Sequence, residues 1–108
     1  MASADDVRRL AMELEGTTEN AHFDRAAFKV ARIYATLSGD GKSLNLKLMP
    51  DEQEFRVMMA PALFSPIPNA WGKQGWTSVD VEAIGTAELR EALRTAWEHG
   101  RAKSPKKR

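Results

Sequence analysis

Few residues of this chain combine the type and spacing that a chemical reaction needs. The segment Gly39-Asp40-Gly41-Lys42-Ser43 superficially resembles a phosphate-binding loop. That loop needs a glycine five residues before Gly41, where this chain has Thr36, and it needs a helix after it. An alternating apolar pattern follows instead, which predicts a strand. We therefore interpret the segment as a hairpin turn.

Metal-binding and nucleophilic patterns have no better support. Glu19, His22 and Asp24 are neighbours that could ligate a metal, but the other histidine, His99, is distant and cysteine is absent. A histidine held in a loop is the simpler interpretation of His22. No serine lies in the Gly-x-Ser-x-Gly turn of nucleophilic hydrolases. We expect no catalytic residue, metal or cofactor, and predict that the protein is not an enzyme.

The more promising side chains lie on one predicted sheet face. Apolar and polar residues alternate through 31–37 and again through 43–48, which is the period of a strand buried on one side. The strand predicted at 76–81 alternates in the same way. Cationic side chains on such a face could contact phosphates, and aromatic rings could stack on bases. Alternation directs six side chains to this exposed face: Arg32, Tyr34, Asn45, Lys47, Trp76 and Ser78.

An alternative covers the same face with the chain itself. Residues 61–75 contain three prolines and two glycines, which is typical of a loop that wraps the surface. This loop could fold over the sheet around Trp71 and Trp76 as a small satellite core, or it could form one wall of a groove. The aromatic and proline-rich stretch 64–76 could then line a ligand pocket.

Charge is distributed unevenly along the chain. Sixteen basic and fifteen acidic residues give a net charge of +1, but five basic residues and no acidic one lie in 101–108. Residues 1–100 therefore carry a formal charge of −4. A basic tail attracts polyanions, or it only keeps the protein soluble. The candidate nucleic-acid contacts are Arg32, Tyr34, Asn45, Lys47, Trp76, the turn residue Lys42, and the tail residues Lys103, Lys106, Lys107 and Arg108.

The predicted elements place these residues on an antiparallel sheet. Ser3 and Asp6 predict a capping box for a first helix that Gly16 ends, and Thr86 begins a last helix that Gly100 ends. Between them we predict a β region over 28–37, a turn, a strand over 43–48, a helix over 50–59, a loop over 61–75 and a strand over 76–81. The two terminal helices would cover one face of the sheet, which gives a two-layer α+β domain.

The length of 108 residues fits one domain, predicted at 1–100, followed by a disordered basic tail at 101–108. No apolar stretch approaches the roughly 20 residues that span a bilayer. The acidic N-terminus lacks an apolar signal core. We therefore expect a cytoplasmic protein without a membrane partner.

Short motifs along the chain resemble those of the MmcQ/YjbR family of small bacterial proteins, over roughly residues 5–108. They are His22-Phe23, Phe28-Lys29-Val30, the segments 32–37, 44–48 and 50–53, Phe64-Ser65-Pro66, the segment 70–76, Val79-Asp80-Val81, and the segments 88–93 and 96–97. The resemblance implies a CyaY-like fold related to double-wing DNA-binding domains, DNA binding and no established enzyme activity. Two positions depart from the family pattern. Where the family often has a turn that contains glycine and lysine, this chain has Ala31-Arg32, and where the family often has a glycine after His-Phe, this chain has Asp24.

Two functions are therefore expected to compete. The first is DNA binding without catalysis, through the basic and aromatic sheet face and the basic tail. The second is binding of a small ligand or a protein partner, with no nucleic-acid role. The negative charge of residues 1–100 weighs against the first, because DNA-binding domains are usually basic as a whole.

Overall fold

The computed structural model describes residues 1–101 of the chain. The tail positions Lys103, Lys106, Lys107 and Arg108 lie outside the described residues. The elements in chain order are α1 (Ala4–Met12), β1 (Thr18–His22), β2 (Arg25–Lys29), β3 (Ile33–Leu37), β4 (Ser43–Lys47), α2 (Pro50–Met59), β5 (Phe64–Pro66), α3 (Ala70–Lys73), β6 (Trp76–Asp80) and α4 (Thr86–Arg101).

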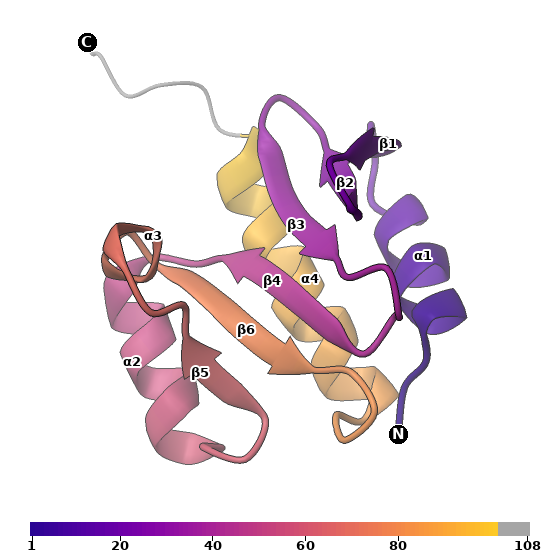
Figure 1. The fold of residues 1–108 in the computed structure, drawn as a ribbon. Coiled ribbons are helices and arrows are strands. Elements are labelled where there is room, and N and C mark those ends of the chain that lie inside the picture. Colours follow the sequence, from indigo (N-terminus) through magenta and orange to yellow (C-terminus); the bar gives the residue numbers. More distant parts are fainter. Residues whose placement is uncertain (102–108) are drawn as a thin grey trace, which may run out of the picture.

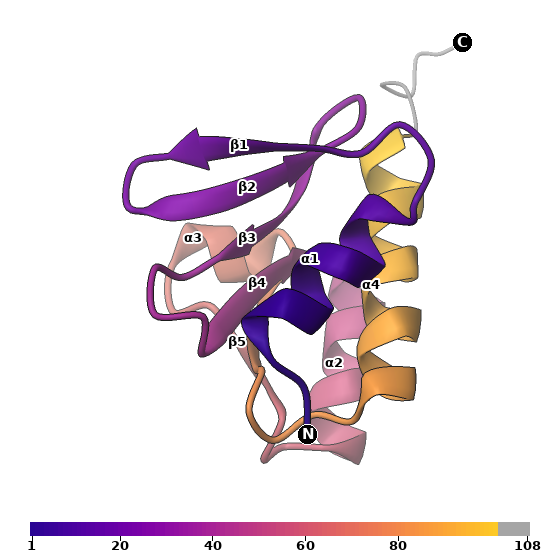
Figure 2. The ribbon, with the colours of Figure 1, turned by 90° about the vertical axis from the view of Figure 1, so that its right-hand side faces the viewer.

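The strands form one antiparallel sheet in the order β1-β2-β3-β4-β6-β5 (Figure 1). The three longer helices, α1, α2 and α4, lie on one side of this sheet (Figure 2). Helix α4 packs on β3 and β4, and α2 lies against β5. The predicted two-layer α+β architecture is thus confirmed, with α2 as an additional covering helix. We call the opposite side of the sheet the open face.

Both terminal helices form for the reasons that the sequence suggests. Ser3 Oγ accepts the Asp6 N–H at 3.2 Å, and the Asp6 carboxylate accepts the Ser3 N–H at 3.0 Å, which completes the capping box. Apolar residues at helical spacing then turn inward in each helix. The buried residues of the two helices are Val7, Leu10, Ala11, Leu89, Ala92, Leu93, Ala96 and Gly100.

The hydrophobic core lies between these helices and the sheet. Leu44 and Leu46 of β4 face it, and their register partners on the neighbouring strands face it too. Paired residues of an antiparallel sheet point to the same side. The side chains that alternate with these therefore point to the open face, as Asn45 does between its partners Thr36 and Ser78.

The predicted position of Tyr34 on the exposed face is wrong. Phe28 pairs with Ala35 and Lys29 pairs with Ile33, so β3 carries one extra residue, Tyr34, in a β-bulge. The bulge reverses the alternation: Tyr34 is fully buried in the core, whereas Ile33 lines the open face. The Tyr34 hydroxyl hydrogen-bonds Thr17 Oγ1 at 2.9 Å, and burial raises the pKa of Tyr34.

Four further element predictions need correction. Helix α1 ends at Met12 and not at Gly16. The β region over 28–37 is two strands, since β2 ends at Lys29 and a turn separates it from β3. Residues 61–75 are not only a loop, because they contain β5 and α3. Helix α4 continues through Gly100, whose missing Cβ permits close packing: a Cβ there would lie 2.9 Å from Tyr34 Cβ. Strand β1 was not predicted at all.

Candidate binding groove on the open face

A cavity of about 510 Å³ lies on the open face of the sheet. We call it the groove. Its lining is predominantly apolar and aromatic, and it comes from the β1–β2 turn, β3, β4, the segment before α3, α3 itself and the start of β6. The lining residues are His22, Phe23, Asp24, Arg25, Ile33, Thr36, Asn45, Ile67, Trp71 and Trp76.

One wall of the groove is the tip of the β1–β2 hairpin, which extends away from the helices (Figure 2). His22 pairs with Arg25, so Phe23 and Asp24 form a two-residue turn. Phe23 has φ = 60°, a left-handed conformation that glycine adopts at far lower energy. Phe23 is 93% exposed, and its ring meets the His22 ring edge-on at 4.9 Å between ring centroids. The turn therefore holds an exposed aromatic ring in a strained backbone position.

The opposite wall is built by α3 and the segment before it. The Asn69 side chain accepts the Trp71 N–H at 2.8 Å and caps the short helix. Gly72 packs so closely on Ile67 that a Cβ there would lie 1.7 Å from the Ile67 carbonyl oxygen. Gln53 of α2 ties this wall to the fold by donating to the Gly72 and Trp76 carbonyls at 3.0 and 2.9 Å. Trp71, on this fixed turn, stays 58% exposed.

The floor of the groove is polar at two positions. Arg25 lies across β3: its Nε donates to Thr36 Oγ1 at 2.9 Å, and its Nη2 donates to the carbonyls of Thr36 and Ser43 at 2.9 and 3.3 Å. Burial lowers the pKa of Arg25 from its ordinary value. The other polar group is the Asn45 side-chain amide, which makes no hydrogen bond within residues 1–101.

The structure separates the sheet residues that the sequence predicts as one surface. Asn45 and Trp76 line the groove, and Tyr34 lies in the core. Lys42 is exposed in the β3–β4 turn and lines a different cavity of about 380 Å³, which it shares with Asp80 and Glu82. Arg32 and Lys47 lie in a separate cluster with Glu52 and His99.

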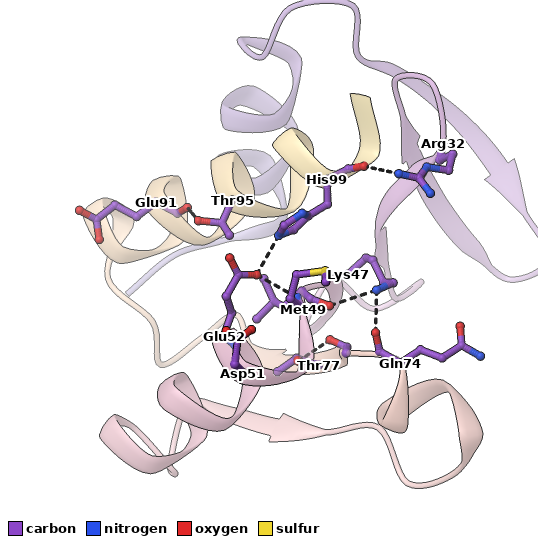
Figure 3. A network of polar contacts seen from close by, with 12 residues as sticks. Arg32, Lys47, Met49, Asp51, Glu52, Gln74, Thr77, Glu91, Thr95 and His99 are labelled. Carbon is purple, nitrogen blue, oxygen red and sulfur yellow. Dashed lines mark hydrogen bonds and ion pairs between the residues drawn. The ribbon is translucent and has the colours of Figure 1, made fainter. Parts of the chain in front are cut away.

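These four residues, which we call the edge cluster, are drawn in Figure 3. Arg32 Nη2 donates to the His99 carbonyl at 2.7 Å, near the C-terminus of α4, where a cation complements the helix dipole. Lys47 Nζ donates to the Gln74 and Leu48 carbonyls at 2.6 and 3.1 Å. His99 Nε2 lies 2.8 Å from Glu52 Oε1. Burial, and then repulsion by Arg32, lower the pKa of Lys47. These bonds join α2 to α4, and they join the end of β4 to the turn before β6.

Sequence reasoning missed most of the groove walls. Phe23, Arg25 and Ile33 were not candidates, and Trp71 entered only through the alternative in which 61–75 covers the sheet. The sequence did contain a signal for the first wall. Phe23-Asp24 separates the segments 18–22 and 25–29, which can pair as a hairpin with a two-residue turn. The position of Ile33 had no local signal, since it depends on the bulge at Tyr34.

The structure provides no metal centre or membrane-crossing helix in the part of the chain that it describes. Among residues 1–101, no three histidine, aspartate or glutamate side chains lie close enough to hold a metal ion. Glu19 instead pairs with Arg8 at 3.0 Å. No helix within the same residues is long and apolar enough to cross a bilayer.

The fold and the groove define a small two-layer α+β protein with an uncovered sheet face. Within that class, the chain belongs to the YjbR family, whose model matches residues 12–99. The family resemblance seen in the sequence is therefore confirmed. No curated protein matches the chain in sequence.

Two solved structures are similar to this one. A Deinococcus radiodurans protein with a DUF419 domain, the same family, superposes with a TM-score of 0.82 at 25% identity, over 99% of this chain and 84% of that chain. A Pseudomonas syringae protein superposes with a TM-score of 0.65 at 18% identity, over 86% and 94% of the two chains. The second likeness concerns the fold alone.

Proposed function

We propose that this protein is a binding module without catalytic activity, and that the groove takes a small ligand with a planar ring. The observation that carries this proposal is a concave, mostly apolar site of about 510 Å³ between two exposed aromatic walls. Ligand sites in proteins have volumes of roughly 300–1,000 Å³ and combine apolar walls with a few polar groups.

Both aromatic walls of the groove are exposed to water, which supports a ligand whose ring stacks on them. Phe23 and Trp71 leave 93% and 58% of their surfaces in water, although large aromatic residues gain most from burial. Phe23 also occupies a backbone conformation that costs on the order of 1–3 kcal/mol. A ring bound between the two side chains would remove apolar surface from water on both faces.

The polar groups of the groove favour binding over catalysis. Its ionisable side chains are His22, Asp24 and Arg25. Nucleophilic catalysis needs a nucleophile hydrogen-bonded to a base. The one hydroxyl of the lining, on Thr36, accepts a hydrogen bond from Arg25, and it makes no hydrogen bond to His22 or Asp24 within residues 1–101.

Tryptophan fluorescence tests the proposal directly. Trp71 and Trp76 line the groove, whereas Trp97 of α4 donates its Nε1–H to the Glu15 carbonyl at 2.9 Å and lies outside the groove lining. We expect a set of soluble one- and two-ring compounds to contain members that quench the wild-type protein saturably. Trp71→Ala should weaken this binding at least about tenfold, and Trp97→Phe should preserve it. Equal affinities in both variants, or no saturable quenching, would refute the proposal.

DNA binding is a second candidate function. It is favoured by the five basic residues and no acidic one in 101–108, and by what the family resemblance implies. Residues 1–101 carry 12 basic and 15 acidic residues, and Lys47 is hydrogen-bonded to two carbonyls, so the tail would carry most of the affinity.

Salt dependence separates this candidate from the groove ligand. Replacing Lys103, Lys106, Lys107 and Arg108 by alanine should flatten the slope of log affinity against log salt by up to about 0.9 per lost phosphate contact. The Trp71→Ala variant should bind duplex DNA as the wild type does. If the full chain shows no salt-sensitive DNA binding, this candidate is excluded while the groove proposal stands.

A further inference from the structure

We propose that the groove recognises a neutral, planar nitrogen heterocycle that carries a hydrogen-bond donor beside an acceptor on one edge. This is the chemistry of the nucleobases, and Asn45 would bind that edge. The inference rests on the proposed function, because it names the class of ring that the groove takes.

Asn45 lines the groove from the sheet. It lies on β4, which is paired on both sides, so its backbone is held by β3 and by β6. Its side-chain amide offers one acceptor oxygen and two N–H donors, and it has no hydrogen-bond partner within residues 1–101. Asn45 is half-buried and lines this mostly apolar site.

Covering this amide with a plain hydrocarbon ring would be unfavourable. A polar group that loses water without gaining a partner costs on the order of 1–3 kcal/mol. A ring with a donor beside an acceptor avoids this loss, because an asparagine amide can bind such an edge through two hydrogen bonds. The floor therefore selects among the planar rings that the aromatic walls would otherwise accept equally.

The neighbouring groups limit the charge of the ligand. Asp24 and Arg25 contribute one negative and one positive charge to the lining, so their charges offset each other. Three hydrogen bonds of Arg25 are already made to β3 and β4, and only its Nη1 makes none within residues 1–101. A phosphate site would instead need converging cations. The groove thus suits the base rather than the phosphate of a nucleotide.

Two sources could supply such a ring: a free nucleoside, or a base turned out of a single-stranded nucleic acid. Both present the same ring to the walls and the same edge to Asn45. They differ in length and in phosphate charge, so the test compares the four common nucleosides with single-stranded oligonucleotides of the preferred base.

The experiment is a two-dimensional NMR titration of the full chain that follows the Asn45 side-chain amide signals. Purine riboside is the matched probe, because it has the purine ring of adenosine without the exocyclic amino group. We expect at least one nucleoside to shift the Asn45 signals and to bind about tenfold more tightly than purine riboside. Asn45→Leu should abolish that preference while purine riboside still binds; Ser78→Ala, a change at the neighbouring open-face position, should keep it.

The outcomes separate this inference from the proposed function. If rings bind with equal affinity whatever their edge, or if Asn45→Leu leaves the preference intact, edge recognition is refuted and groove binding survives. If no ring compound binds the groove, both are refuted. If a single-stranded oligonucleotide binds more tightly than its nucleoside, and Asn45→Leu loses this tighter binding, the source of the ring is a nucleic acid. If the oligonucleotide and the nucleoside bind with equal affinity, the source is the free nucleoside.

Discussion

The groove lies on the open face of the sheet, whereas the edge cluster gathers residues from the end of β4, from α2 and from α4, and the two regions use their side chains in opposite ways. In the edge cluster, the side chains of Lys47, Glu52 and His99 all make hydrogen bonds within the fold. Lys47 donates to the Leu48 and Gln74 carbonyls, and Glu52 of α2 bonds His99 of α4 (Figure 3). In the groove, Phe23 and Trp71 remain exposed and Asn45 lacks a hydrogen-bond partner within residues 1–101.

This difference shows that residue type alone does not identify a binding surface. Cations are attractive candidates for phosphate contacts, but a lysine held by two backbone carbonyls would have to give up those bonds before it could bind a ligand. Aromatic side chains held in water, one of them at a strained turn, have unused interaction surface. The comparison predicts that changes in the edge cluster alter stability, whereas changes in the groove alter binding.

The largest expected effect comes from Gly75, which lies between Lys47's partner Gln74 and the start of β6. Gly75 has φ = 110°, and a Cβ there would lie 1.7 Å from the Leu48 carbonyl oxygen. Gly75→Ala should therefore destabilise the protein by about 3 kcal/mol or more, through backbone strain and steric overlap. Urea unfolding measures this loss. Trp71→Ala is the control in the groove, and it should cost less than about 1 kcal/mol of unfolding free energy. Similar losses in both variants would show that the Trp71 side chain supports the fold as strongly as the turn that holds Lys47, which would contradict its assignment to binding.

A smaller loss is expected at Lys47. Lys47→Met keeps the apolar stem but leaves the Gln74 and Leu48 carbonyls without their Nζ donor, which should cost about 1–2 kcal/mol of unfolding free energy. Binding of ring compounds to the groove should not change, because Lys47 does not line it. Loss of ring binding with unchanged stability would place Lys47 in the binding site and contradict this assignment.

Phe23→Gly should act in the opposite direction on stability. Glycine accepts φ = 60° without strain, and Phe23 loses little burial because it is 93% exposed, so we expect a gain of roughly 1 kcal/mol. The same variant should bind ring compounds more weakly, because one wall of the groove is gone. Urea unfolding and fluorescence titration check the two effects. A destabilised variant with unchanged ring binding would show that Phe23 has a structural role instead.

The smallest expected effect is a pH dependence in the edge cluster. The pKa of Lys47 is lower in the folded protein than its ordinary value of 10.5, so the unfolded chain binds more protons between those two values. The contribution of Lys47 to stability should therefore increase as pH rises through this window. As the pH is raised toward 10.5, the stability difference between wild type and Lys47→Met should widen. A narrowing difference would show that the ammonium charge itself stabilises the fold.

Much of the fold was predictable because local signals determine it. The capping box of Ser3 and Asp6, the proline and acidic residues that begin α2, and the alternating leucines of β4 all predict their elements. The family and the two-layer architecture also follow from the sequence.

The site was less predictable because its geometry depends on pairing between strands. One extra residue at Tyr34 exchanges the positions of Ile33 and Tyr34 between the two faces, and only the partner strand β2 reveals that bulge. The shorter hydrogen bond of Lys47 goes to Gln74, which is distant in sequence, so alternation could not predict it. Asn45 and Trp76 were placed on the correct face, since no irregularity interrupts β4 or β6.

The most direct test of the account is one NMR titration in which every backbone amide and tryptophan indole is followed. On addition of a ring compound that binds, we predict shifts of the Trp71 and Trp76 indoles and of the amides near Phe23 and Asn45. The signals of the edge cluster and of the Trp97 indole should stay in place. Shifts centred on Arg32, Lys47 and His99, with the groove signals unmoved, would contradict the assignment of the open-face groove as the binding site.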